Sequence, residues 1–297
     1  MKINVSRYSD RHSFEIMGAS YIGAPRSNTA MFINKKVERL LPALNDVKEC
    51  LIFAEDSIFV PPELAEKHAF VLTAKPQLEY ARFAKQFADE RFEEEKKLKF
   101  ELMPEGYYIS EDSVVALDAY IEPGCVIGPD ARIGYRARIY ANSVIRRCTI
   151  GDDFVANEHC VVGANGFTMA DDENGNKIRI PTLGRVVIGN NVEVGSHNNV
   201  SCGSGGDTVL EDNVKMDSLI HVGHDVHLHK NVEVTAGVTF SGFVDAGEGT
   251  YVGVGSVLRN RIVLGERAFI GMGSNVTKSV DAGVIVAGNP AKPFVKK

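Results

Sequence analysis

The sequence predicts a mainly β fold, in which a small N-terminal α/β domain precedes a parallel β-helix built from six-residue repeats. Aliphatic or small residues recur at every sixth position from Leu210 to Ala282. A second run keeps this period from Ile109 to Ile145 and then resumes one residue early at Ile150. A period of six matches neither the 3.6-residue turn of an α-helix nor a simple strand alternation. It is typical of a chain that coils around a prism and places one repeat on each flat face.

The repeat also predicts which residues stack. Three faces of six residues make a coil of eighteen, so residues eighteen apart lie above one another at the strand spacing of about 4.8 Å. We expect the first residue of each repeat to point into the core. Glycine at the second place, as at Gly128 and Gly271, is expected to supply an unusual corner conformation. The fifth residue is small and is expected inside as well, at Cys125, Ala137, Ser143, Val214, Val226, Val232 and Val238.

Three regions follow from these patterns. Residues 1–84 are expected to form the small α/β domain, residues 85–107 a helical connector, and residues 108–297 the β-helix. The connector is predicted because Tyr80–Leu98 is rich in Ala, Glu, Lys and Phe. The expected elements of the first domain are strands at Ser13–Met17, Ala30–Ile33, Glu49–Ala54 and His68–Leu72 and a helix at Val37–Leu44.

Two segments interrupt the repeat. Residues 168–184 are polar and contain a turn-forming run of Asp, Glu, Asn and Gly, which predicts a hairpin-like loop. Residues 203–208 form a shorter, glycine-rich excursion. Loops on a rigid solenoid are frequent positions for binding residues.

Composition narrows the classes of function. The chain has 297 residues, 44% of them hydrophobic, and a net charge of −6, which argues against a nucleic-acid surface. No run is apolar enough for a membrane span or a signal peptide, so we expect a cytoplasmic protein. The five cysteines have no metal-binding spacing and are expected to be reduced, packed thiols.

Four histidines gather between Ile220 and Lys230: His221, His224, His227 and His229. Their places in the repeat put them at different corners and faces, so we do not expect them to converge on one metal ion within a chain. For His221, His227 and His229 we favour ordinary surface positions.

His224 differs from the others by its neighbours. Gly206 and Gly242 lie eighteen residues before and after it, so a bare backbone N–H is expected above the ring. Asp217 and Asp225 supply carboxylates that could hold one ring nitrogen and make the other a better base. A histidine base beside an exposed N–H suits attack on an acyl group, with the N–H receiving the oxyanion. The alternative is that His224 is also a surface residue.

Other nucleophiles have weaker support. The chain contains no Gly-x-Ser-x-Gly elbow, and the glycine-rich run from Gly203 lacks the Lys-Ser/Thr ending of a phosphate-binding loop.

These residues carry a resemblance to a known family. The loop Gly163–Phe167, the segment Lys177–Pro181, the repeat from Gly184 to Gly189, Asp207–Thr208 and Met216–His224 resemble the UDP-3-O-(3-hydroxyacyl)glucosamine N-acyltransferases of lipid A biosynthesis, within the hexapeptide acyltransferases. The resemblance implies a left-handed β-helix.

The resemblance also implies roles for individual residues. His224 would be the general base, Asp217 its orienting acid and Gly242 the oxyanion donor; Asp225 is similar to the acid beside the histidine in related acyltransferases. The segment Thr29–Lys36 is similar to the family's uridine-binding segment. Substrate-binding residues implied in this way are Asn34, Phe32, Asn165, Phe167 and Arg261.

Several positions depart from the family. Met31 and Val37 stand where the family stacks uracil on aromatic rings, and Arg261 stands where it has a second histidine. We expect no counterpart of the family's C-terminal helical extension, and Gly288–Pro293 resembles acetyl-coenzyme A dependent sugar acetyltransferases instead. The acyl donor could therefore be an acyl carrier protein or coenzyme A.

The sequence thus predicts an N-acyltransferase that moves an acyl group from a pantetheine thioester to the amine of a nucleotide-linked sugar, in lipid A or surface-polysaccharide synthesis. The resemblance implies a homotrimer and no tightly bound cofactor or metal, with acyl-acyl carrier protein or acyl-coenzyme A as co-substrate. Two other classes stay open: a non-catalytic β-helix scaffold and a γ-type carbonic anhydrase.

Overall fold

The computed structural model describes residues 1–293, so residues 294–297 of the predicted β-helix domain lie outside it. The chain divides into two compact units. Among the described residues, the first comprises residues 1–96, 167–184 and 204–206, and the second comprises residues 97–166, 185–203 and 207–293. All of the first predicted excursion and half of the second, residues 204–206, are therefore grouped with the N-terminal unit.

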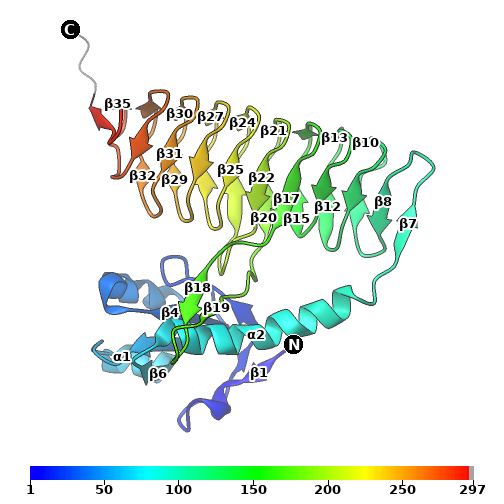
Figure 1. Cartoon of the computed structure of the whole chain (residues 1–297). Helices are drawn as coiled ribbons and strands as arrows, with labels where there is room; N and C mark the ends of the chain where they lie inside the picture. The colour runs from blue at the N-terminus through cyan, green and yellow to red at the C-terminus, as the bar shows by residue number, and fades with distance from the viewer. Residues whose placement is uncertain (294–297) are drawn as a thin grey trace. The chain divides into compact units, whose positions relative to one another are not determined.

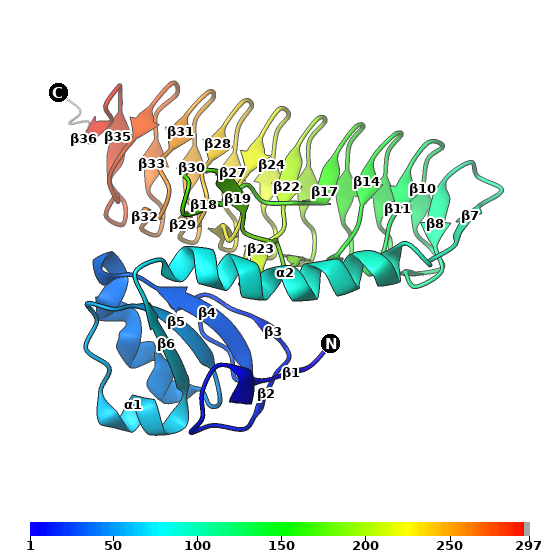
Figure 2. The same cartoon turned by 60° about the horizontal axis from the view of Figure 1, so that its bottom comes forward.

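The first unit is built on a parallel four-stranded sheet (Figures 1 and 2). Both faces of the sheet are buried, as alternation along one strand makes clear: Leu51 and Phe53 belong to one apolar cluster, whereas Ile52 and Ala54 belong to another. In spatial order the strands are β3 (Gly18–Ala19), β4 (Thr29–Ile33), β5 (Leu51–Glu55) and β6 (Ala69–Thr73).

Helices cover these two faces. The long helix α2 (Pro76–Glu95) packs Leu78, Phe83 and Phe87 into the cluster of Leu51 and Phe53. A 3₁₀ segment (Lys35–Asp46) covers the other face and has non-helical backbone at Val37, in place of the helix expected at Val37–Leu44. The remaining elements are β1 (Ile3–Asn4), a 3₁₀ turn (Val5–Arg7), β2 (Glu15–Ile16), and α1 (Pro62–Lys67), which the sequence did not reveal.

The predicted hairpin-like excursion is a hairpin. Strands β18 (Met169–Asp171) and β19 (Lys177–Arg179) pair antiparallel. The Asp172 carboxylate closes the turn between them by accepting hydrogen bonds from the backbone N–H groups of Asn174 and Asn176. Lys75 and Arg82 bind the turn to α2, through the Asp172 carbonyl and the Glu173 carboxylate respectively.

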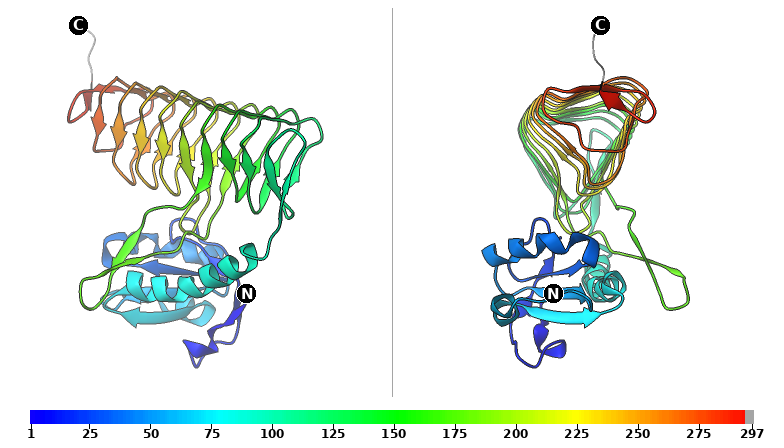
Figure 3. Two further views of the ribbon diagram at one scale, coloured as in Figure 1. Left: turned by 45° about the vertical axis from the view of Figure 1, so that its right-hand side comes forward. Right: turned by 90° about the vertical axis from the view of Figure 1, so that its left-hand side faces the viewer.

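The second unit is a parallel β-helix with a triangular cross-section (Figure 3). The first face contains β10 (Tyr120–Ile121), β13 (Arg138–Ile139), β16 (Val155–Ala156), β21 (Glu193–Val194), β24 (Lys215–Met216), β27 (Glu233–Val234), β30 (Tyr251–Val252), β33 (Phe269–Ile270), β35 (Ile285–Ala287) and the antiparallel β36 (Lys292–Pro293). The second contains the antiparallel β7 (Phe100–Leu102), then β8 (Tyr108–Ser110), β11 (Val126–Ile127), β14 (Val144–Ile145), β17 (Val161–Ala164), β22 (Asn199–Ser201), β25 (His221–Val222), β28 (Thr239–Phe240), β31 (Val257–Leu258) and β34 (Asn275–Val276). The third contains β9 (Val114–Val115), β12 (Ala131–Ile133), β15 (Cys148–Ile150), β20 (Val186–Ile188), β23 (Thr208–Leu210), β26 (His227–Leu228), β29 (Asp245–Ala246) and β32 (Val263–Leu264).

Where no excursion interrupts the coil, the stacking register is the predicted one. Val222 pairs with Phe240, eighteen residues further on, and Phe240 pairs with Leu258. Where the repeat resumes one residue early, Ile133 pairs with Ile150 instead. The slip in the sequence is therefore absorbed within one coil, and the next strands keep their inward faces.

The residues at the first place of each repeat form the core. From Leu210 to Val276 every one of them is buried, while the last predicted position, Ala282, is exposed because the regular coils end there. The seven small residues predicted inside at the fifth place are all buried.

The expectation that glycine at the second place of the repeat supplies an unusual corner conformation is wrong. The left-handed backbone falls at the fourth place of the repeat, as at Asp130 (φ +57°) and Gly273 (φ +65°), rather than at the second. Glycine is favoured at the second place by close approach instead: a Cβ added to Gly271 would lie 2.9 Å from the Cβ of Ala287 on the next coil.

All five cysteines are buried and free of disulfides, as expected. Among residues 1–293, no helix has the length and apolar character that crossing a bilayer requires.

Buried His68 should make the first unit sensitive to acid. Its Nδ1 accepts from the Cys50 N–H (3.2 Å) and its Nε2 donates to the Leu44 carbonyl (3.0 Å), and burial lowers the pKa of the ring below its ordinary value of 6.5. The unfolded chain then binds a proton that the native one does not, so stability is lost as pH falls below 6.5 towards the lower native pKa. The measurement is hydrogen exchange of the β5 backbone amides. After correction for the intrinsic exchange rate at each pH, we expect the protection of these amides to fall between about pH 7.5 and about pH 5.5. An equal fall in His68→Gln would contradict this assignment.

Candidate active site

The predicted base, His224, lies in the corner between β25 and β26. Its side chain is only 15% exposed, and its Nδ1 lies 2.8 Å from Oδ2 of Asp225. An ionised carboxylate can only accept, so Nδ1 carries the proton and donates it to Asp225. The basic lone pair is thereby assigned to Nε2.

Asp225 is held in place by its own backbone. Its φ of +57° is in the left-handed region, which Asp tolerates better than most residues, and its N–H donates to Thr208 Oγ1 at 2.9 Å. The Asp225 side chain is 3% exposed, so its interaction with the His224 ring is weakly screened by water. Thr208 is one of the residues that carry the resemblance, but the sequence did not reveal that it positions Asp225, because it acts through a hydrogen bond between coils.

Gly242 lies against the His224 ring, as the register predicted. A Cβ added to Gly242 would be 2.5 Å from Cε1 and 2.6 Å from Nε2 of that ring. The Gly242 N–H makes no hydrogen bond within the described residues, while its carbonyl accepts from the N–H of Arg261. A backbone donor thus lies beside the basic nitrogen with no side chain of its own in the way.

On the preceding side, the glycine against His224 is Gly166 rather than the expected Gly206. A Cβ added to Gly166 would lie 2.9 Å from the His224 Cβ. The reason is a change of register: Asn199 pairs with His221, 22 residues on, because the excursion at 203–206 is inserted before the eighteen-residue spacing resumes at Val209. Gly166, in the segment Gly163–Phe167 that carries part of the resemblance, therefore packs closely against His224.

The second acid does not join this pair. Asp217, which the resemblance implies as the orienting acid, accepts through its carboxylate from the N–H of the adjacent Ser218 (2.7 Å). Within one chain the carboxylate on the His224 ring is that of Asp225, since the left-handed corner turns this side chain back onto its neighbour.

Phe243 completes the column above His224 and was missed from the sequence. Its ring meets the His224 ring edge to face, with centroids 5.1 Å apart. The Arg261 guanidinium lies 3.9 Å from the Phe243 ring centroid, one coil further on. Arg261 is thus brought towards the site, stacked on Phe243. The eighteen-residue register, applied to Phe243 and Arg261, could have found this column.

The other predicted binding residues have different surroundings. Asn165 is exposed and its Oδ1 accepts from Arg147 (2.9 Å). Phe167 is 74% exposed and belongs to the first unit, where the Arg179 guanidinium lies 5.2 Å from its ring centroid.

The remaining histidines do not all stay apart. Burial, and then the nearby charge of His224, lowers the pKa of His221, whose Nδ1 lies 3.2 Å from Asn199 Nδ2. His227 and His229, expected to be separate, stack with ring centroids 3.9 Å apart. His227 begins β26 and His229 directly follows its end, so the two residues are two positions apart along extended backbone and both side chains project from the same face.

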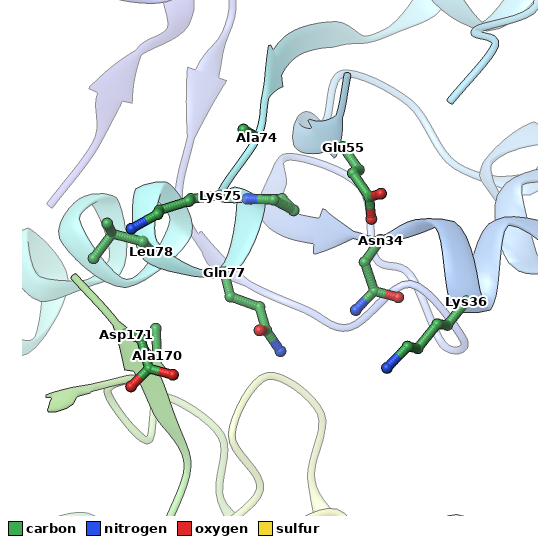
Figure 4. A pocket seen from close by; sticks show the side chains of 10 residues that line it. Asn34, Lys36, Glu55, Ala74, Lys75, Gln77, Leu78, Ala170 and Asp171 are labelled. Carbon is green, nitrogen blue, oxygen red and sulfur yellow. The ribbon is translucent and has the colours of Figure 1, made fainter. Parts of the chain in front are cut away.

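A pocket of about 340 Å³ in the first unit contains one of the predicted binding residues, Asn34 (Figure 4). The Asn34 Oδ1 is buried and has no hydrogen-bond partner among the described residues, so a donor from a ligand would satisfy it. Charged and polar groups dominate the rest of the lining: Lys36, Glu55, Lys75, Gln77 and Asp171.

No aromatic ring lines this pocket within the described residues. Met31 and Val37, at the family's aromatic positions, pack into or against the cluster under the 3₁₀ segment, and Met31 is fully buried. Phe32 points to the opposite face, where its ring lies 5.3 Å from that of Tyr80. Phe32 therefore belongs to the packing of α2 on the sheet.

Curated relatives confirm the resemblance. The chain is 40% identical over 124 residues to a UDP-3-O-acylglucosamine N-acyltransferase of Hydrogenovibrio crunogenus, covering 41% of this chain and 35% of the relative. It is 32% identical over 153 residues to a probable UDP-3-O-acylglucosamine N-acyltransferase of Arabidopsis thaliana, covering 52% and 50%. The chain thus spans half or less of the length of these relatives. No family model matches it.

Solved structures confirm the expected left-handed parallel β-helix. Acinetobacter baumannii LpxA is 25% identical, with a TM-score of 0.58, over 65% of this chain and 74% of its own. An LpxA from Bacteroides fragilis, described as a UDP-N-acetylglucosamine acyltransferase, is 17% identical with a TM-score of 0.56 over 65% and 74%. The second likeness concerns the fold alone.

Gly242→Ala tests the geometry around the base. The new Cβ would overlap the His224 imidazole, so we expect a folded protein in which a crystal structure shows the ring moved off Gly242. A displacement of this kind lowers the rate of a reaction carried by the ring by about 100-fold. Gly18→Ala is the control, because its Cβ would have nothing within 4 Å. An unmoved ring in Gly242→Ala would contradict the close packing.

Proposed function

We propose that this chain is an N-acyltransferase that transfers an acyl group from a pantetheine thioester to the amine of a nucleotide-linked amino sugar. One observation carries the proposal: the His224 imidazole is held at Nδ1 by buried Asp225, while Gly242 offers a bare backbone N–H beside Nε2. Direct acyl transfer is catalysed by a general base together with a hydrogen-bond donor that stabilises the oxyanion. The named relatives support the substrate class.

The reaction then needs no covalent enzyme intermediate. The neutral sugar amine attacks the thioester carbonyl, which forms the new C–N bond while His224 Nε2 takes a proton from the amine. The carbonyl oxygen becomes an oxyanion that the Gly242 N–H stabilises. Collapse breaks the C–S bond, and the imidazolium returns its proton to the departing thiolate. Asp225 stabilises the imidazolium between these two steps.

The pocket at Asn34 is the proposed site for the nucleotide. Its polar lining suits hydrogen bonding to a base or ribose, and the buried Asn34 Oδ1 would accept from an N–H group of the base. Recognition would then depend on hydrogen bonds and charge, since the pocket lining lacks aromatic rings within the described residues.

The proposal defines the acyl donor less narrowly than the sugar that accepts the acyl group. Acyl carrier protein and coenzyme A both present the acyl group on a pantetheine arm, so either satisfies the proposed chemistry. A homotrimer is part of the proposal, because the resembling enzymes are expected to complete each site with a neighbouring subunit. The scaffold and carbonic anhydrase alternatives predict no acyl transfer.

His224→Ala is the direct test of the base. We expect kcat/KM for acyl transfer to fall by about 100-fold to 10,000-fold, because general-base assistance is lost. Asp225→Asn should lose activity as well while keeping its side-chain volume. His159→Ala is the matched control, since His159 stacks on His197 elsewhere in the β-helix. Near wild-type turnover in His224→Ala, with an intact oligomer, would refute this role.

A panel of substrates determines which acyl donor and which nucleotide sugar the protein uses. UDP- and dTDP-linked amino sugars are each combined with acetyl-coenzyme A and with long-chain acyl-acyl carrier protein, and product is measured by mass spectrometry. We expect transfer with at least one pair, and an increased KM for the nucleotide sugar in Asn34→Ala. Unchanged KM in that variant would place the nucleotide elsewhere, and no product from any pair would contradict the proposed activity.

A further inference from the structure

We propose that Glu211, His227 and His229 form a binding site for a divalent transition-metal ion of the zinc class on the third face of the β-helix. Among the described residues, these three side chains are the group whose ligand atoms converge, all lying within 4.8 Å of one another. Two imidazole nitrogens and one carboxylate oxygen form a donor set that Zn²⁺ accepts readily. The site does not depend on the proposed acyl transfer.

The register of the solenoid creates this convergence. His227 is the first residue of β26, and His229 follows that strand, so both rings project outward from one face. Glu211 directly follows β23 on the preceding coil, where Val209 pairs with His227. One Glu211 oxygen, Oε1, consequently lies 2.8 Å from His227 Nε2 and 3.3 Å from His229 Nδ1.

A second acid supports His229 from the other side. The Nε2 of His229 lies 3.1 Å from Asp245 Oδ1, on the following coil, while its Nδ1 faces Glu211. Metal-bound histidines commonly donate their second ring N–H to a carboxylate, which fixes the tautomer and raises the basicity of the ligating nitrogen. Asp245 occupies the position of such an outer partner, and this arrangement is independent of the convergence itself.

The separations are compatible with ion binding. Zinc–ligand distances of about 2.0–2.2 Å place tetrahedral ligand atoms about 3.4 Å apart. Glu211 Oε1 lies at or inside this separation from both ring nitrogens, so it would have to move outward slightly. No pair of ligand atoms is more than 4.8 Å apart, so none would have to close by more than about 1.4 Å. Their side chains are 29–35% exposed, which leaves them room to rotate. The Glu211 carboxylate also supplies a negative charge that attracts a cation.

The bound ion would link two consecutive coils, joining β23 to β26. Strand β26 directly follows the corner that holds His224 and Asp225. The site is nevertheless separate from the catalytic pair, since none of its residues touches the Nδ1 hydrogen bond between His224 and Asp225. Its test can therefore be read independently of enzyme activity.

The test is a titration of the full chain, free of any histidine tag, with Co²⁺ as a spectroscopic stand-in for Zn²⁺. We expect d–d absorption typical of nitrogen and oxygen ligands, saturating at one ion per chain, and its displacement by Zn²⁺. His229→Gln and Glu211→Gln should each abolish stoichiometric binding. Asp245→Asn should weaken it by about 10-fold to 100-fold, as expected for an outer partner.

His197→Gln is the matched control. His197 also stacks on a second histidine, His159, with centroids 4.9 Å apart, but this pair belongs to no convergent ligand group in the described part of the chain. Binding should be unchanged in this variant. Failure of the wild-type chain to bind Co²⁺ or Zn²⁺, or binding that persists in both His229→Gln and Glu211→Gln with folding intact by circular dichroism, would overturn the proposal.

Discussion

The backbone hydrogen bonds between successive coils are the constraint on which the β-helix and its sites depend. Apart from the terminal β7 and β36, each strand of the β-helix pairs in parallel with the strand one coil away, so a residue's partner is fixed by counting along the chain. A shift of one residue would turn a strand's inward face outward. The ladder of buried aliphatic residues penalises such a shift at every coil. Side chains at the corners and on the outer faces therefore occupy fixed positions relative to one another.

How much the sequence could predict follows from this constraint. Where the coil is regular, counting placed Gly242 over His224 without any structure. Where the chain leaves the coil, counting failed: the excursion at 203–206 lengthened the register, and Gly166 replaced Gly206 as the neighbour of the base. A periodic pattern carries no information about the length of backbone that an inserted loop consumes, so such neighbours require coordinates.

The six-residue pattern also contains no information about the local backbone geometry at single residues. Asp225 holds the ring because a left-handed corner residue turns its side chain back, which a count of repeats does not express. His227 and His229 were expected apart because their repeat positions differ. Residues two apart on an outward face nonetheless project together, and a carboxylate one coil below completes the group. The two-residue alternation of side chains along a strand, combined with the register between coils, would have identified the group formed by Glu211, His227 and His229.

The polar lining of the proposed nucleotide pocket has a consequence for specificity. Aromatic stacking accepts any base, because every base has a π face, whereas a buried amide oxygen without a donor penalises ligands that leave it unsatisfied. The Asn34 Oδ1 is such an acceptor, set between Lys36 and Glu55 in the pocket lining. A site of this kind discriminates against an analogue that lacks the matching N–H more strongly than an apolar pocket discriminates by size. Recognition by hydrogen bonding at Asn34, with Met31 and Val37 in place of stacking rings, would thus exchange general affinity for the base against selectivity for its edge.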